Sequence, residues 1–185
     1  MPPASRRIES HETTVERHRT YIDAVDGDCV IDVLQGQLYW MCELAGCMSA
    51  EFVDKRHPPY TWTIRQVLSH CLDCERIFGD RMHRIAAGDK TDLPGFDENA
   101  YADARFGLGN IGHLVAEWGH VRQANLGLLD RIVPRAWDRR GCVDGHPITV
   151  RALAWLAAGH LQHHLDIVEM RCEIQVPRRP EAERG

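Results

Sequence analysis

The chain has 185 residues, enough for one domain with a buried core, and carries 44% hydrophobic residues, 26% charged residues and a formal net charge of −5. These values are typical of a globular protein. No apolar run approaches the roughly 20 residues that cross a bilayer, and the 22 Lys and Arg residues form no basic stripe for nucleic acid. The N-terminal basic pair has no apolar segment behind it, and the seven cysteines match no disulfide framework. We therefore expect a cytoplasmic protein with reduced thiols and with neither a membrane nor a nucleic acid as partner.

The first half of the chain predicts a polar N-terminal segment followed by two helices. Residues 1–21 are polar and show no sustained period. Apolar residues recur near helical spacing over residues 28–48, which predicts the first helix. The adjacent prolines of HPPY at residues 57–60 break it, and Thr63 is suited to cap the next helix. The apolar stripe of this second helix runs as far as Gly88, and it is the clearest amphipathic pattern in the sequence.

The second half predicts a long loop, two more helices and a disordered end. Residues 88–110 are rich in Gly, Asp and Pro and too many for a tight turn, which favours a crossover loop over one end of a bundle. A third helix is expected over residues 111–132, and residues 137–149 form a short irregular segment after it. Thr149 is suited to cap a fourth helix over residues 150–172. The polar residues 175–185 are expected to be disordered.

Four periodic segments of about 20 residues each, without a convincing alternating strand pattern, predict an all-α fold. The expected architecture is a four-helix bundle over residues 22–174 with a long crossover loop between its second and third helices. Bundles of this kind build metal sites from side chains on their inner faces.

Histidine is the unusual residue type of this chain, with 11 copies, three of them in GHLQHH at residues 159–164. His160 and His164 stand four apart, which places both on one face of the fourth helix, as two ligands of one ion require. A solvated outer pair is the alternative, since the strong zinc motif adds a catalytic Glu that is absent here. His70 lies on the apolar stripe of the second helix, where a lone histidine would be costly unless bonded, and this favours the metal interpretation. The three histidines predict one divalent metal ion, with a hydrogen-bonded core cluster as the competing account.

Cysteines on the same helices offer a second chemistry. Cys71 and Cys74 form a CxxC that invites a redox or zinc interpretation. Both lie on the apolar stripe, buried cysteine is a routine small core residue, and no second CxxC completes a four-sulfur site. We therefore expect Cys71 and Cys74 to be core residues, and Cys42 and Cys47 of the first helix to have the same explanation.

Other polar residues are candidates for supporting roles. Asp97 and Glu98 of the crossover loop could hang over the metal as base or substrate clamp, with a polar cap on the bundle as the alternative. Glu75 and Arg76 are expected to form a solvated or structural charged pair. Three residues could accept a hydrogen bond from a ligand imidazole: His113, His120 and Asp166. Five histidines in polar stretches are expected at the surface: His11, His18, His57, His83 and His146.

Three stretches carry a family resemblance over most of the chain. They are YTWTIRQVLSHCLDCERIFGDRMHRIAAGD, LPGFDENAY and ITVRALAWLAAGHLQHHLDIV. The sequence resembles the DinB-like superfamily, in particular its YfiT-type branch of metal-dependent hydrolases and thiol S-transferases. The resemblance implies a metal triad of His70, His160 and His164, with His163 as an extra histidine that is not a ligand. The chain departs from the common pattern at Cys71 and Cys74, where aliphatic or small residues are frequent.

The resemblance also implies how such a protein works. It implies an up-up-down-down bundle and a homodimer, with one divalent ion per chain, nickel or zinc ahead of iron, manganese or copper, and with open positions filled by water. The ion would activate a low-molecular-weight thiol, such as bacillithiol or mycothiol, or a water for attack on a small electrophilic substrate. The alternative is a non-catalytic role, in which the ion braces a stress-related binding or dimerisation protein.

Overall fold

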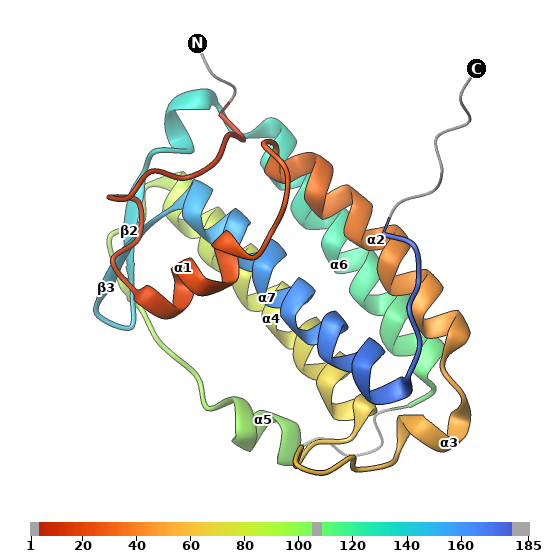
Figure 1. Cartoon of the computed structure of the whole chain (residues 1–185). Helices are drawn as coiled ribbons and strands as arrows, with labels where there is room; N and C mark the ends of the chain where they lie inside the picture. The colour runs from red at the N-terminus through yellow and green to blue at the C-terminus, as the bar shows by residue number, and fades with distance from the viewer. Residues whose placement is uncertain (1–3, 105–108, 179–185) are drawn as a thin grey trace, which may run out of the picture.

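Four long helices form a bundle in the computed structural model, which describes residues 4–104 and 109–178 (Figure 1). They are α2 (Val30–Cys47), α4 (Ile64–Ala87), α6 (Ile111–Arg131) and α7 (Val150–Cys172). Shorter helices accompany them: α1 (Glu16–Asp23), α3 (Ala50–Val53), α5 (Glu98–Ala104) and the 3-10 turn Pro134–Ala136. The predicted four-helix bundle is confirmed. No helix within the described residues is long and apolar enough to span a membrane.

The two helices that carry the site begin and end where local chemistry directs. The Thr63 hydroxyl accepts the Gln66 N–H at 3.2 Å while the Gln66 side chain accepts the Thr63 N–H at 2.9 Å, a reciprocal capping box that starts α4. Gly88 ends α4 in the left-handed region at φ 95°. At the start of α7, the Thr149 hydroxyl accepts the Ala152 N–H at 3.1 Å. The predicted caps are therefore confirmed.

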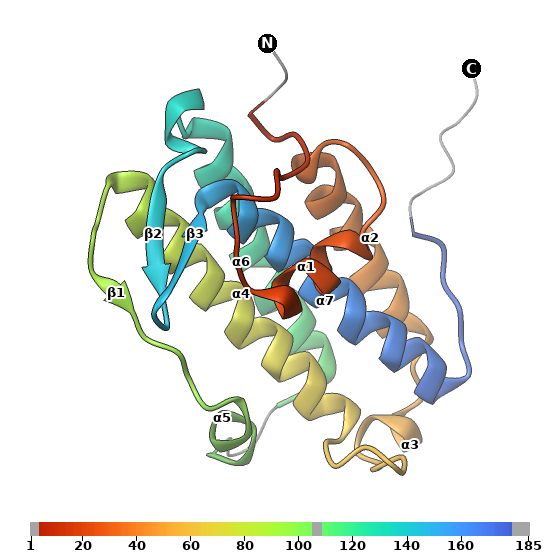
Figure 2. The same cartoon turned by 60° about the vertical axis from the view of Figure 1, so that its left-hand side comes forward.

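The helix directions follow from the connections. Both α4 and α2 pack against α6 and against α7, so α2 lies diagonally across from α4. Figures 1 and 2 show α2 and α7 running one way and α4 and α6 the other. The order is therefore up-down-down-up, whereas the resemblance implies up-up-down-down. The short connection through α3 makes α2 and α4 antiparallel, and the long connection over residues 88–110 returns the chain so that α4 and α6 are parallel.

A small sheet covers one end of α4, and here the expectation of an irregular segment without strands was wrong. It comprises β1 (Asp92–Leu93), β2 (Arg140–Val143) and β3 (His146–Thr149), in that order, with β1 parallel to β2 and β2 antiparallel to β3 (Figure 2). Asp144 and Gly145 join β2 to β3 with φ angles of 51° and 75°. Two successive positive φ angles in an Asp-Gly pair are the signature of a two-residue hairpin turn.

The polar segments at the two ends belong to the folded unit. The buried carboxylate of Glu12 accepts a hydrogen bond from the Arg151 guanidinium at 3.0 Å, and α1 lies across α7. At the other end, Val176 is buried and Arg178 forms an ion pair with Glu169 of α7. The polar ends are thus ordered because they supply partners for charges on the most buried helix. Of residues 175–185, for which disorder was expected, residues 179–185 lie outside the described part of the chain.

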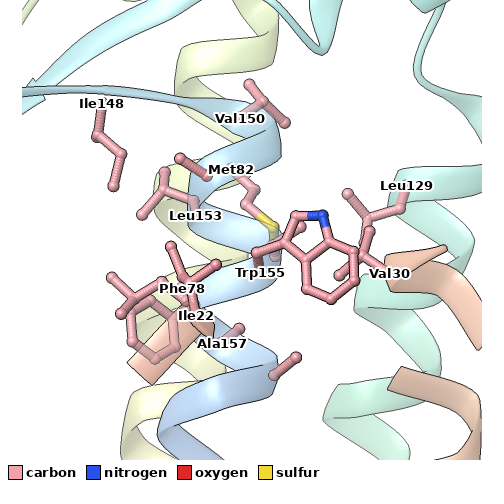
Figure 3. Packing of buried hydrophobic residues seen from close by; sticks show 14 of the residues in the cluster. Ile22, Val30, Phe78, Met82, Leu129, Ile148, Val150, Leu153, Trp155 and Ala157 are labelled. Carbon is pink, nitrogen blue, oxygen red and sulfur yellow. The ribbon is translucent and has the colours of Figure 1, made fainter. Parts of the chain in front are cut away.

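The hydrophobic core consists of two clusters stacked along the bundle. One surrounds the first half of α7, where Val150, Leu153 and Trp155 pack against Phe78 and Met82 (Figure 3). The other surrounds the second half of α7 and is built on a different set: Leu161, Leu165, Val168, Leu68, Met41 and Trp118. The buried polar side chains lie at one level along the bundle axis, where the two clusters adjoin.

A charged network occupies this level and ties all four long helices together. Arg122 of α6 donates two hydrogen bonds to the Glu75 carboxylate of α4, at 2.8 and 2.7 Å, and a third to Gln37 of α2 at 2.9 Å. Asn125 donates to the same carboxylate at 2.8 Å. Gln37 in turn donates to the Ala158 carbonyl of α7 at 2.7 Å. Because the Arg122 side chain is 0% exposed, the ion pair is fully buried.

Candidate metal centre

Three imidazoles, that of His70 buried and those of His160 and His164 half-buried, meet where α4 packs against α7. His70 comes from the seventh residue of α4, and His160 and His164 come from one face of α7. The Nε2 atom of His160 lies 3.1 Å from Nε2 of His70 and 3.2 Å from Nε2 of His164. The sequence-predicted residues are therefore brought together, with His160 in the middle.

A fourth group joins them that the sequence interpretation had placed in the core. Cys74 Sγ lies 3.5 Å from His70 Nε2 and 3.8 Å from His160 Nε2. His70, Cys74 and His160 form the set whose ligand atoms all lie within 4.8 Å of one another, and His164 reaches this set through His160. The available signal was the spacing of Cys74 four residues after His70, which repeats the spacing of His160 and His164. Cys74 also forms a CxxC with Cys71, and this second spacing favours a different interpretation.

Burial keeps the imidazoles neutral. It lowers the pKa of His70 from 6.5 to about 4, with the Asp73 carboxylate opposing the change. Burial also lowers the pKa of His160 to about 3, and the neighbouring His70 acts in the same direction. The pKa of His164 lies well below 6.5 for the same reasons. A neutral imidazole presents the ring-nitrogen lone pair that a metal ligand needs, so all three histidines are ready to bind a cation at neutral pH.

Aromatic rings wall this cluster. The Trp62 ring lies 5.1 Å from the His70 ring, and Phe78 lies 5.7 Å from the His160 ring, centroid to centroid. On the remaining side, Tyr21 of α1 contacts both His160 and His163, at 5.7 and 5.1 Å. The helix α1 was not expected from the sequence, so Tyr21 is a site neighbour that sequence reasoning missed.

The other histidines and Asp166 lie outside the cluster. His163 is exposed and lies 5.2 Å from the His164 ring, centroid to centroid. Asp166 forms an ion pair with Arg178 at 2.9 Å, and His113 and His120 are exposed on α6, across the bundle from α7. Asp166, His113 and His120 were the expected partners of the imidazoles, but Cys74 is the residue that contacts them. The remaining histidines divide into His11, His83 and His146, which are exposed as expected, and His18 and His57, which are half-buried.

The acidic candidates have mostly structural partners. Asp97 accepts the backbone N–H groups of Asn99 and Ala100 at 3.0 Å each, which makes it the cap of α5. Glu98 is half-buried. The expected pairing of Glu75 with Arg76 was wrong, because Glu75 points inward to Arg122 while Arg76 pairs with Glu117 at the surface.

The donor set fits a divalent metal ion. Two nitrogens bound to one tetrahedral ion at about 2.0–2.1 Å lie about 3.3 Å apart. The two measured Nε2–Nε2 distances, 3.1 and 3.2 Å, are close to this value. The residues could therefore hold an ion without rearrangement of the helices.

Comparisons with known proteins agree with this architecture. The family model of the DinB superfamily matches residues 41–168. The chain belongs to the DinB superfamily. The match contains all of α4, α6 and the histidines of α7, so the imidazole cluster lies inside the part of the chain that defines membership.

One solved structure is similar over nearly its whole length. It is YfiT from Bacillus subtilis, described as a probable metal-dependent hydrolase with an unusual four-helix bundle topology. The TM-score is 0.64 at 17% sequence identity, covering 93% of this chain and 99% of YfiT. At this identity the likeness shows that the two proteins share a fold. None of the curated proteins compared with the chain matches it significantly.

Proposed function

We propose that this DinB-superfamily protein is a metal-dependent enzyme that activates a water or a low-molecular-weight thiol for attack on a small electrophilic substrate. In this proposal His70, His160 and His164 hold one divalent ion, nickel or zinc ahead of iron, manganese or copper. The observation that carries it is the meeting of three neutral imidazoles, one buried and two half-buried, with Nε2 atoms 3.1 and 3.2 Å apart. YfiT, which shares the fold, is described as a probable metal-dependent hydrolase, and this supports the same class of chemistry.

The chain's own residues supply position and environment. A bound divalent ion would supply a Lewis acid that lowers the pKa of a water or thiol. The neutral imidazoles of His70, His160 and His164 add no negative charge to that cation, so its pull on an anionic ligand stays strong. Trp62 and Phe78 pack against the rings of His70 and His160 and give the site apolar walls. Low local polarity strengthens each remaining electrostatic contact.

Substrate access is proposed from the side of α1. A surface pocket of about 670 Å³ is lined by Arg17 and Tyr21 of α1 and by His163 of α7, among other residues. The Tyr21 ring separates this pocket from His160, whose ring it contacts. A small displacement of Tyr21 would therefore connect the pocket with the imidazoles. Its volume suits a small molecule.

The test begins with metal content. Elemental analysis of the purified wild type is expected to give one divalent metal per chain, and a triple H70A, H160A, H164A variant should give none. Thiol consumption with a haloarene electrophile, and hydrolysis of a chromogenic ester, should both be compared in loaded and chelated protein. H120A, at an exposed position on α6, is the matched control and should keep the metal. Turnover that survives in H160A with no metal bound would contradict the proposal.

A second candidate function has one observation in its favour. Cys74 lies beside His70 and His160, and a metal held by four protein ligands is typical of structural rather than catalytic sites. In that case the ion would brace α4 against α7 in a binding or dimerisation protein. Stoichiometric metal without turnover in either assay would favour this alternative. The homodimer and the cytoplasmic location stay predictions.

A further inference from the structure

We infer that Cys74 supplies a sulfur donor to the metal centre, so that its donor set is three imidazoles and one thiolate. The inference rests on the proposed function in one respect, because it requires that an ion binds at His70 and His160. It goes beyond that function, since the resemblance to the superfamily implies histidine ligands alone and small or aliphatic residues are frequent at this position.

The helix geometry puts Cys74 in the position of a ligand. His70 and Cys74 are four residues apart on α4, and His160 and His164 are four apart on α7. Residues with this spacing lie one above the other on the same face of a helix. Because α4 and α7 are antiparallel neighbours, the two pairs meet across this contact. The ligand atoms of His70, Cys74 and His160 lie within 4.8 Å of one another, and Nε2 of His164 lies 3.2 Å from Nε2 of His160.

Cys74 packs in the hydrophobic cluster around the first half of α7, and the hydrogen-bonding contacts of its sulfur lead to the imidazoles. Among the described residues, its hydrogen-bonding partners are ring nitrogens of His70 and His160. The Cys74 side chain is only 4% exposed, so water does not provide an alternative partner. A buried thiol whose polar partners are imidazole nitrogens is placed for coordination as well as for packing.

The distances agree with a shared ion after one rotation. A sulfur at about 2.3 Å and a nitrogen at about 2.0–2.1 Å from a tetrahedral ion lie about 3.6 Å apart. The measured distances from Cys74 Sγ to Nε2 of His70 and His160 are 3.5 and 3.8 Å. Sγ also lies 3.8 Å from His70 Nδ1, so it lies beside the ring and not along the Nε2 lone pair. Coordination of one ion by both residues would therefore involve a change in the χ1 angle of Cys74.

Cys71 shows that burial on α4 does not by itself place a thiol in the cluster. It is 2% exposed, one residue after His70, yet it belongs to the core cluster around Leu161 and Leu165. The 100° turn per residue of an α-helix separates its direction from that of His70 and Cys74. Cys71 is therefore a natural control for the removal of a buried sulfur.

Sulfur coordination would change the chemistry of the centre. The metal–sulfur bond would form as the thiol proton passes to solvent, and one water would leave the ion. The thiolate would lower the net charge of the centre by one and would favour zinc, nickel or copper over manganese. Substrate would then have to enter as a fifth ligand or displace the sulfur.

The experiment is spectroscopic and needs no turnover. Metal-free wild type, C74A, C74S and C71A are each titrated with Co²⁺, and the absorption spectrum and affinity are recorded. Wild type and C71A should show a sulfur-to-cobalt charge-transfer band in the near ultraviolet, and both Cys74 variants should lose it. C74A should also bind Co²⁺ at least about tenfold more weakly. Mutation of a residue that only hydrogen-bonds to a metal ligand already lowers metal affinity by about 10–100-fold. X-ray absorption of the zinc-loaded wild type should show one sulfur at about 2.3 Å.

The outcomes separate this inference from the proposed function. Cobalt binding to the wild type with d–d bands but without the sulfur band would overturn the inference and leave the three-histidine centre intact. Absence of cobalt and zinc binding to folded wild type would overturn both. The wild-type spectrum alone decides between these results, so the test does not depend on how well the variants fold.

Discussion

At the scale of single residues, burial is the dominant influence on the histidines of the cluster. It lowers the pKa of His70 to about 4 and that of His160 to about 3, against a usual value of 6.5. Their neutrality in the folded state is what allows them to lie with ring nitrogens 3.1 Å apart. Protonation of any one of them would place a charge in an apolar wall of aromatic rings.

The metal-free protein should therefore lose stability as the pH falls below about 6.5. Between that pH and the folded-state pKa values, the unfolded chain binds protons that the folded chain does not, so the free energy of unfolding decreases with falling pH. The contribution of the neutral histidines to stability is fully present above pH 6.5. Between pH 7.5 and 5 its loss is on the order of 1–3 kcal/mol per histidine. Urea titrations in the presence of chelator at pH 7.5 and 5 measure the change.

A double variant, H70Q/H160Q, provides the control for this pH dependence, because glutamine cannot titrate in this range. Its stability should change less between pH 7.5 and 5 than that of the wild type. An equal slope in the two proteins would mean that the loss arises from other groups, such as His18, whose pKa burial also lowers.

At the scale of elements, α4 and α6 carry two ion pairs in opposite environments. Glu75 and Arg122 are buried, with side chains 4% and 0% exposed, whereas Arg76 and Glu117 are about half exposed. Glu75 and Arg76 are adjacent in the sequence, so the contrast comes from helix phase alone. Because of this contrast, the loss of unfolding free energy on breaking a buried ion pair can be compared with the loss on removing an exposed charge.

R122M should lower the free energy of unfolding by about 3–5 kcal/mol, because it leaves the Glu75 carboxylate buried without its partner. R76Q, which breaks the exposed pair with Glu117, should cost less than about 1 kcal/mol. Denaturant unfolding of both variants measures the difference. The double variant E75Q/R122M should recover part of the loss, and no recovery would show that Arg122 acts through packing on Trp118 rather than through its charge.

The docking of α1 onto α7 rests on a glycine. A Cβ atom at Gly159 would lie 2.1 Å from the Tyr21 carbonyl oxygen, a backbone atom that no side-chain rotation can move away. G159A should therefore displace α1 and cost about 1–3 kcal/mol. At Gly127 of α6 an added Cβ meets nothing within 4 Å, so G127A should stabilise by up to about 1 kcal/mol through helix propensity. Thermal unfolding distinguishes the two, and equal effects would contradict the proposed close contact.

These elements also show how far sequence could lead. The long helices were predictable because their apolar stripes repeat with the helical period, and the caps at Thr63 and Thr149 have side chains suited to that position. The helix α1 was not, because Glu16–Asp23 is short and polar and gains its stability from α7. The hairpin did carry an Asp-Gly signal between two short strands, which the irregular composition around it obscured.

At the scale of the whole molecule, the polar residues form one level between two hydrophobic clusters. The Glu75–Arg122 network fills the interior of this level, and the imidazoles with Cys74 lie at the α4–α7 contact beside it. The sequence could indicate three histidines on inward faces, but not which face of α4 meets α7. That depends on the order of the helices around the bundle, and the crossover that sets this order has no pattern of its own in the sequence.

Metal binding should stabilise the entire bundle. His70 and His160 are 90 residues apart, so only the folded chain assembles the donor atoms, and an ion that binds the folded state alone raises the free energy of unfolding. At a free metal concentration 100 times Kd the increase is about 2.7 kcal/mol. Thermal unfolding of chelated protein, with and without added Zn²⁺ or Ni²⁺, measures it. H120A should show the full increase, because the imidazole that it removes is exposed on α6. The triple H70A, H160A, H164A variant should show none. Equal stabilisation of the triple variant would mean that the ion binds elsewhere, for example at the exposed thiols of Cys42 and Cys47, and that the buried histidines serve the core rather than a metal.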